Sequence, residues 1–277
     1  MQISPVYDDP GFFAYDLGPA DPSVPLLRQR RRLAALAAGL DADQWDAPSR
    51  CDTWSVRDVL SHLVTTNEFW AFAVAGARAG EPTRVLASFD PVATPAALVD
   101  AARDQSADEV LDRFVATTEA LAAALDGLDA AGWGRPGEAP PGHVPLRAVA
   151  LHALWDGWVH ERDIALPLGL ATVEEPDEVA ASLGYAAALG PAFAAATGGG
   201  LGALAVEATD PTVRLVVEVG EGTVAVRDGD APADALRLTG PAVALVEGLS
   251  LRAPLPCPVP DERSWLLSGL ATVFDQA

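Results

Sequence analysis

Apolar residues recur every three or four positions in four segments of the first 170 residues. This spacing predicts helices that each bury one face. Each segment begins beside a residue that favours a helix start: Pro25, Ser55, Thr94-Pro95 or Pro145. Helices joined by short or medium loops pack as antiparallel neighbours, so we expect a four-helix bundle. The predicted helices cover 26–39, 55–79, 94–128 and 145–166.

The pattern changes after residue 170. One further helix is predicted over 176–196, and three consecutive glycines follow it at 198–200. Beyond them, runs rich in β-branched residues predict strands, with Gly220-Glu221-Gly222 as a hairpin turn. Strands and helices in one short segment indicate a small α+β domain. The predicted strands cover 204–208, 213–219, 223–227 and 236–239, and the helices after them cover 240–249 and 261–275.

The remaining segments predict irregular structure. Residues 1–22 hold four prolines and several acidic residues, so we expect an irregular N-terminal arm that packs on the body. Glycine and proline over 132–145 predict a loop. The expected fold class is therefore α+β, with the bundle over 23–170 and the second domain over 171–277.

Charge and composition narrow the classes of function. Acidic residues outnumber basic ones by 39 to 18, which disfavours binding to nucleic acid or to an anionic membrane surface. Every basic residue is arginine, which excludes a Schiff-base lysine and a P-loop lysine. The arginine-rich run over 28–32 predicts a solvated helix face. The start of the chain resembles no signal peptide, and the uncharged stretch over 184–206 is too rich in alanine and glycine for a membrane span. We therefore expect a cytoplasmic protein with no membrane association.

Candidate chemistry gathers in the fourth predicted helix. His152, Asp156 and His160 follow one another at steps of four residues, so they lie along one stripe bordered by apolar side chains. Burying an unpaired aspartate beside two histidines costs free energy, and a bound cation would offset that cost. Asp156 and His160 together form a common half-site for zinc, and His62 on the second helix can complete it. Two histidines and one carboxylate leave a position open, which is typical of a reactive site.

Other interpretations of these residues stay open. An aspartate four residues before a histidine also forms a simple salt bridge, and His62 taken alone fits a satisfied core histidine. His152 fits a residue behind the ligands better than a fourth ligand. His143, in the proline-rich loop, is expected at the surface. Cys51 is expected to pack beside Trp54 rather than to react.

The segment Cys51–Leu63 resembles a specific family. It reads CDTWSVRDVLSHL and resembles the C-x-G-W-x-V-x-D-V-x-x-H-L opening of mycothiol-dependent maleylpyruvate isomerase-like proteins, within the DinB-like four-helix-bundle superfamily. The segment from Asp156 to Asp163 resembles the family's E-x-x-x-H-x-x-D signature. Leu238-Thr239-Gly240-Pro241 matches the L-x-G-P turn of its second, sterol-carrier-like domain. Two positions depart from the pattern: Asp156 replaces the family's glutamate, and Thr53 replaces its glycine.

The resemblance implies a ligand set and a cosubstrate. It assigns His62, Asp156 and His160 to a divalent metal ion of the zinc type, and it implies the low-molecular-weight thiol mycothiol as cosubstrate. It also implies an arginine that reaches the active site, for which Arg252 is the counterpart in a shifted register. Asp163 fits a partner of His160 or of the substrate.

Three functions follow from this assignment. The first is a metal- and thiol-dependent S-transferase or cis–trans isomerase that acts on a small electrophilic metabolite, and the departures from the family pattern favour the transferase. Arg57, Arg162 or Arg252 could bind a substrate carboxylate, but a structural salt bridge is the expected role of each. The second is a zinc hydrolase or cyclase whose base is Glu161, Asp163 or His152. The third is a binding protein without catalysis. The sequence leaves the substrate and the oligomeric state open.

Overall fold

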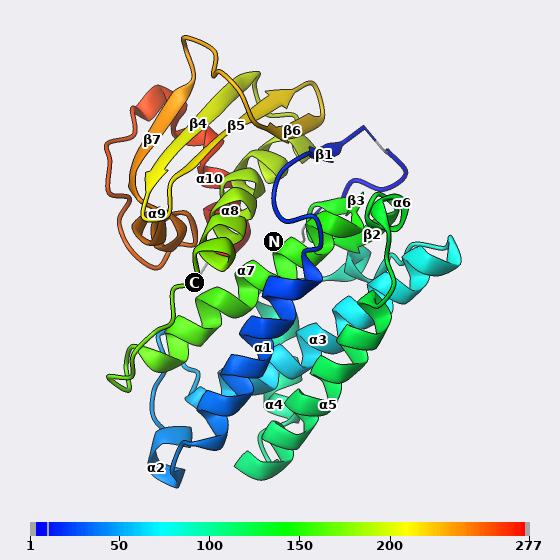
Figure 1. Ribbon diagram of the computed structural model, residues 1–277, viewed down its shortest axis with the longest axis vertical. Coiled ribbons are helices and arrows are strands. Elements are labelled where there is room, and N and C mark those ends of the chain that lie inside the picture. The colour runs from blue at the N-terminus through cyan, green and yellow to red at the C-terminus, as the bar shows by residue number, and fades with distance from the viewer. Residues whose placement is uncertain (1–3, 10, 275–277) are drawn as a thin grey trace.

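The structure is a computed structural model that describes residues 4–9 and 11–274. Helices fill one half of the molecule and a sheet lies in the other, with one long helix between the two (Figure 1). The expected α+β class, with a helical bundle followed by a sheet domain, is confirmed.

The bundle consists of four long helices, each of which contacts two of the others. Their starts follow the sequence signals. Ser55 accepts a hydrogen bond from the Asp58 backbone N–H while the Asp58 carboxylate accepts from the Ser55 backbone N–H, so the second helix begins with a capping box. The four helices are α1 (Ser23–Ala38), α3 (Val56–Ala79), α5 (Ala107–Leu125) and α7 (Leu146–Ala165).

Two predictions for the bundle are wrong in detail. The helix expected over 94–128 is split into α4 (Ala93–Ala101) and α5, because Ser106 and Glu109 form a capping box that starts a new helix. The loop expected over 132–145 contains a hairpin of β2 (Pro136–Ala139) and β3 (Gly142–Pro145). The short elements α2 (Ala42–Trp45), η1 (Val85–Ser88) and α6 (Ala130–Trp133) complete this half.

The sheet has the strand order β1-β6-β5-β4-β7, in which β1 is Phe13–Tyr15. Its antiparallel β4–β5–β6 meander follows the prediction, with the β5–β6 turn at Glu221-Gly222. Strand β7 then returns parallel to β4. The strands are β4 (Gly202–Thr209), β5 (Val213–Gly220), β6 (Thr223–Arg227) and β7 (Leu236–Pro241). The helices after them are α9 (Ala242–Leu249), η2 (Asp261–Leu266) and α10 (Ser268–Phe274); residue 275, the last of the predicted helix, lies outside the described residues.

The N-terminal arm is not wholly irregular. Within it, β1 (Phe13–Tyr15) pairs parallel with β6 and extends the sheet. Phe12, Phe13 and Tyr15 are buried, which anchors the arm, and β1 covers an edge that β6 would otherwise expose. The arm therefore links the start of α1 to the edge of the sheet (Figure 1).

Helix α8 (Pro176–Ala196) explains the long uncharged stretch of the sequence. It packs against α7 on one side and against β5 and β6 on the other. Of the described residues, it alone forms a helix long and apolar enough to cross a membrane, and 83% of that apolar window is buried inside the protein. Its composition is thus that of a core helix.

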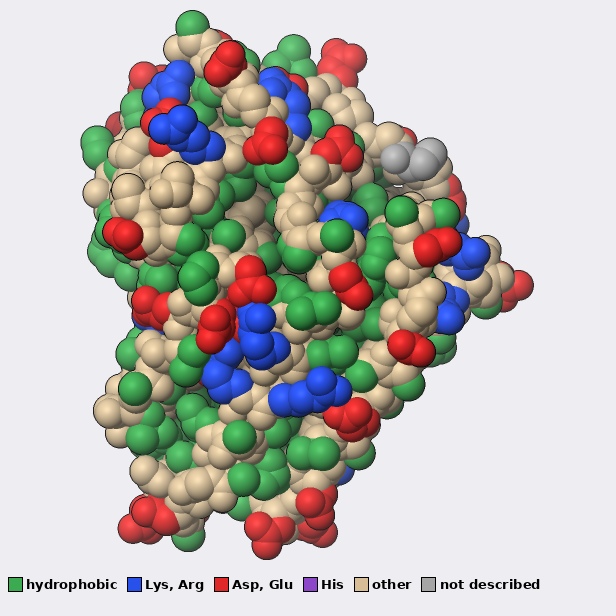
Figure 2. All heavy atoms as spheres, viewed as in Figure 1, with side chains coloured by type: hydrophobic (Ala, Val, Ile, Leu, Met, Phe, Trp, Pro, Cys, Tyr) green, Lys and Arg blue, Asp and Glu red, His purple; other side chains and the backbone are tan. Residues whose placement is uncertain are grey.

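Two predictions of surface residues are wrong. Arg30 is fully buried, because the packed face of α1 includes Gln29 and Arg30 beside the leucines. Arg32 forms ion pairs with Glu161 and Glu178. His143 is buried as well. Its polar ring is accommodated there because Nε2 lies 3.0 Å from the Thr83 carbonyl oxygen. On the viewed face of Figure 2, acidic and basic side chains are interspersed rather than separated.

Candidate functional site

Helices α3 and α7 bring together the three residues that the sequence nominates as metal ligands. His62 lies in the second turn of α3, whose start Ser55 fixes. Asp156 and His160 lie one turn apart on α7. Since α3 and α7 pack against each other, side chains that are far apart in sequence meet at one place.

The three side chains present their ligand atoms toward one another. Asp156 Oδ1 lies 3.5 Å from His160 Nε2 and 4.0 Å from His62 Nε2. The two imidazole rings stand nearly perpendicular, with centroids 5.1 Å apart. Ligand atoms around a tetrahedral zinc ion are roughly 3.3 Å apart, given bonds of about 2.0–2.2 Å. The observed separations are close to that value, so this donor set fits a divalent cation.

The three side chains are buried, and their surroundings shift the pKa values of His62 and Asp156. The exposed fractions of these side chains are only 11–14%. Burial lowers the pKa of His62, which favours the neutral imidazole that binds metals. Burial raises the pKa of Asp156, but the adjacent imidazoles of His62 and His160 outweigh this and lower it. Asp156 Oδ2 is buried without a hydrogen-bond partner among the described residues, and a cation bound by this carboxylate would compensate for that.

Asp163 lies behind His160 and connects several elements. Its Oδ2 lies 3.0 Å from His160 Nδ1, and it accepts hydrogen bonds from Arg50 at 2.9 Å and from Arg252 at 2.9 Å. Burial raises the pKa of Asp163, but the hydrogen bonds with His160 and Arg252 lower it by a larger amount. The carboxylate therefore stays ionised. A carboxylate on the far nitrogen of a ligating histidine fixes the ring's orientation. Asp163 thus holds the Nε2 of His160 toward Asp156.

Cys51 belongs to this cluster rather than to the packing around Trp54 alone. Its Sγ lies 3.3 Å from Asp163 Oδ2 and 3.7 Å from His160 Nδ1. Cys51 and Asp163 approach the same ring nitrogen, so His160 cannot relay a proton from one to the other through its two nitrogens. The sequence gives no signal for this contact beyond the proximity of Cys51 to the start of α3.

Arg252 reaches the site from the sheet domain. Leu251 has φ of 60°, a left-handed turn that carries the chain out of α9 and directs Arg252 back to Asp163. Its Nε and Nη2 are both engaged with Asp163, and Nη2 lies 3.6 Å from Cys51 Sγ. Arg252 thus contacts the partner of His160, and its role as the arginine that the family resemblance implies stays a prediction.

Other candidates from the sequence form ion pairs elsewhere. Arg162 donates to Glu247 at 2.6 Å, and Arg57 pairs with Asp46. Glu247 also pairs with Arg50, which joins α9 to the loop before α3. Sequence patterns do not reveal the ion pair between Arg50 and Glu247, because the two residues are 197 positions apart.

His152 lies one turn before Asp156 but outside the group of three. Its Nδ1 lies 2.7 Å from the Tyr185 hydroxyl, and its ring packs against Trp70 and Trp155. Its expected place behind the ligands stays a prediction.

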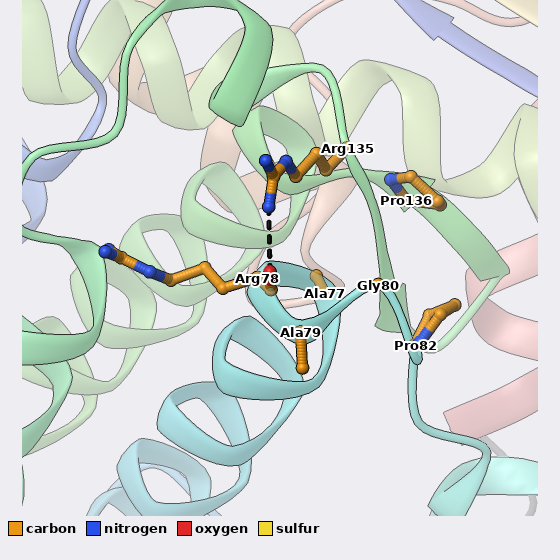
Figure 3. Close-up of a pocket in the computed structure, with 7 residues that line it drawn as sticks. All are labelled: Ala77, Arg78, Ala79, Gly80, Pro82, Arg135 and Pro136. Carbon is orange, nitrogen blue, oxygen red and sulfur yellow. Dashed lines mark hydrogen bonds between the residues drawn. The ribbon is translucent and has the colours of Figure 1, made fainter.

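Two surface cavities lie away from this group. A cavity of about 510 Å³ adjoins the C-terminal end of α3, where Arg135 donates a hydrogen bond to the Arg78 carbonyl (Figure 3). One of about 330 Å³ adjoins His143. Their arginine and histidine donors are engaged with backbone carbonyls, so neither cavity presents a competing cluster of free reactive groups.

Comparison with known proteins identifies the family of this chain. Residues 26–165 match the model of the mycothiol maleylpyruvate isomerase N-terminal domain. The chain belongs to this family. It is also similar to uncharacterized proteins of Mycobacterium tuberculosis strains CDC 1551 and H37Rv, at 29% identity over 174 residues, which are 62% of this chain and 82% of theirs.

The similarity extends beyond the family domain. A crystal structure of the mycothiol-dependent maleylpyruvate isomerase, and one of a mutant in which alanine replaces a histidine, superpose with a TM-score of 0.61 at 16% identity. They cover 88% of this chain and 97% of theirs. The maleylpyruvate isomerase family member described here therefore shares the two-part fold, sheet domain included, with a solved structure.

Proposed function

We propose that this protein is a metal-dependent enzyme that uses a low-molecular-weight thiol, mycothiol, to attack a small electrophilic metabolite. The product is an S-conjugate or, when the thiol is expelled again, a cis–trans isomer. His62, Asp156 and His160 would hold a divalent cation, zinc by the chemistry of the donors. One observation carries the proposal: these donors meet at the spacing of a metal site within a family whose name includes mycothiol.

The chain's own residues have separate tasks in this proposal. When bound, the cation supplies positive charge that lowers the pKa of a thiol, so that the nucleophilic thiolate exists near neutral pH. Asp163 orients His160 and Arg252 together. Arg252 uses Nε and Nη2 on Asp163, which leaves Nη1 without a recorded partner among the described residues, free to donate to an anionic group of the substrate.

The geometry gives less support to the two other functions. A hydrolase needs a free general base, yet Glu161 is ion-paired with Arg32, and Asp163 accepts from Arg50 and Arg252. His152, the remaining candidate, is bonded to Tyr185, and burial lowers its pKa to about 4, which makes it a weak base. A protein that binds only a ligand needs none of the buried ion pairs that orient His160, and a metal-binding protein without catalysis does not need Arg252 beside them. The thiol-dependent enzyme accounts for more of the observed contacts than either alternative, so we prefer it.

Metal content and conjugation together test this function. Purified protein should contain about one zinc ion per chain, and it should conjugate mycothiol with monobromobimane faster than the uncatalysed reaction. His160→Ala should lose both properties. His143→Ala, which removes another buried histidine far from the group, should keep both. Native protein without metal, or a metal-loaded protein with no thiol conjugation, would contradict the proposal.

A further inference from the structure

Helix α9 ends in a turn that leucine rarely adopts. Leu251 has φ of 60°, in the left-handed region that suits glycine. Its backbone N–H donates to the Gly248 carbonyl, and that of Arg252 donates to the Glu247 carbonyl, so both bonds of a Schellman motif are present. The Leu251 side chain is 42% exposed, so its burial does little to offset the backbone strain. A strained residue of this kind persists where the contacts around it hold it in place.

Ser250, the residue before the left-handed leucine, is fixed to helix α7. Its Oγ accepts a hydrogen bond of 2.8 Å from Nε1 of Trp155. Both residues are buried, with Ser250 4% exposed and Trp155 8% exposed. Trp155 is the residue immediately before the metal-ligand candidate Asp156. The bond therefore ties the end of α9 to the turn of α7 that carries Asp156.

Arg252, the residue after the left-handed leucine, returns to the same helix. Its guanidinium donates to Asp163, which lies eight residues beyond Trp155 on α7, roughly 12 Å along the helix axis. This three-residue segment is therefore held at both ends by one rigid element. Asp163 in turn contacts Nδ1 of His160. A displacement of Ser250 would be passed through the turn to Arg252, and from there to the ring of His160.

The ion pairs of α9 do not duplicate the contact of Ser250. Glu247, one turn earlier on α9, pairs with Arg50 and Arg162, and these pairs hold the helix near α7. Arginine side chains have many rotamers and can follow a shift of the backbone, whereas an indole ring and a serine hydroxyl have few. The bond between Trp155 and Ser250 is therefore the short, directional contact at the point where the chain turns.

We infer that Ser250 is a positioning residue, which acts through Arg252 and Asp163 on the metal ligand His160. The inference rests on the proposed function, since it takes the α3–α7 group as the metal site. Bonded to Trp155, Ser250 sets the direction in which Arg252 leaves the turn. Arg252 then keeps the Asp163 carboxylate in the orientation that holds His160 toward the metal. The sheet domain thus influences metal binding through a hydroxyl that lies outside the group of ligands.

Removal of one hydroxyl tests this role. Ser250→Ala removes the acceptor of Trp155, and we expect it to lower zinc affinity about 5-fold, somewhat less than the loss of a direct partner of a ligand. The rate of mycothiol conjugation with monobromobimane should fall about 10-fold in kcat/KM. Ser250→Thr, which keeps the hydroxyl, should retain most of both. Ser182→Ala removes a fully buried hydroxyl of α8 that has no hydrogen-bond partner among the described residues, and it should change neither.

A double-mutant cycle with Arg252→Ala separates positioning from a general effect on stability. If Ser250 acts through Arg252, then Ser250→Ala should change zinc affinity less than about 2-fold once Arg252 is absent. A serine that only stabilises the fold would cause the same loss in both backgrounds. Competition with a chromophoric chelator measures the four affinities, at a temperature at which all four proteins are folded.

The outcomes separate this inference from the proposed function. Unchanged zinc affinity in Ser250→Ala, or an equal loss in both backgrounds, would overturn the inference while the proposed function stands. If Ser250→Ala does not fold, Trp155→Phe removes the donor of the same hydrogen bond and takes its place in the cycle. A wild type that binds zinc without conjugating mycothiol would overturn the proposed function, and the zinc affinities would still decide the role of Ser250. A wild type that binds no zinc would overturn both.

Discussion

Arg30 of α1 lies directly against Gly157 of α7. A Cβ atom on residue 157 would overlap Arg30 Nη1 and lie 2.6 Å from its Cζ. The guanidinium donates to the Asn67 side chain at 3.0 Å and to the Ala153 carbonyl at 2.9 Å. A single buried arginine thereby joins the three helices that surround the candidate site, and the absence of a side chain at 157 makes room for it.

Gly157→Ala should therefore destabilise the protein, although alanine is the better helix former. Alanine gains roughly 0.5–1 kcal/mol in a helix interior, but displacing a buried guanidinium breaks hydrogen bonds to a charged group at about 1.5–3 kcal/mol each. We expect a net loss of about 3 kcal/mol in the free energy of unfolding, measured by urea denaturation. Gly134→Ala, where the nearest atom lies 3.5 Å from the added Cβ, should change it by less than about 1 kcal/mol.

Asp163→Asn should weaken both the fold and the metal site. It leaves Arg50 and Arg252 without their shared carboxylate, and breaking such a buried pair costs about 3–5 kcal/mol. It also removes the acceptor that orients His160, for which a loss of about 10–100-fold in metal affinity is expected. Denaturation and zinc titration measure the two effects. The exposed Asp100→Asn is the control, and equal behaviour of the two variants would refute this role.

His152 should make stability depend on pH. Its pKa is lowered to about 4 in the folded protein, from an unfolded value of about 6.5, because burial disfavours the charged ring. Between these values the unfolded chain binds a proton that the folded protein does not, so stability is full above pH 6.5 and falls as the pH drops toward 4. The loss amounts to about 3 kcal/mol.

The comparison of wild type with His152→Asn isolates this contribution. Stability of the variant should fall less steeply between pH 6.5 and pH 4, because asparagine does not titrate there. Urea denaturation at half-unit steps of pH measures both slopes. Parallel curves would show that protonation of His152 is not linked to unfolding.

Removal of the metal should lower thermal stability. A ligand that binds only the folded state stabilises it by about 2.7 kcal/mol at 100 times its Kd, and in a protein of this size that corresponds to roughly 5–11 °C in Tm. We expect a chelator to lower the Tm of wild type by such an amount and zinc to restore it. His62→Ala should start at the lower Tm and show no response, and a full response of that variant would place the metal elsewhere.

Much of the fold is predictable because it follows local patterns. The meander β4–β5–β6 follows from β-branched runs around a glycine turn, and α3 follows from its capping serine. The break between α4 and α5 is also written locally, in the Ser106–Glu109 capping box, but the continuous apolar spacing on both sides conceals it. The β1 strand has no local signal of comparable strength, because three residues become a strand only when β6 offers an edge.

Sequence alone predicts that His152, Asp156 and His160 share a helix face, because residues four positions apart on a helix are neighbours. The groups that surround them follow from tertiary packing. The contacts of Asp163 with Arg50 and Arg252, of Cys51 with His160, and of His152 with Tyr185 join residues from different elements. Periodicity describes one element at a time, whereas these contacts depend on how α7, α8, α9 and the loop before α3 pack, and that packing is a property of the whole chain.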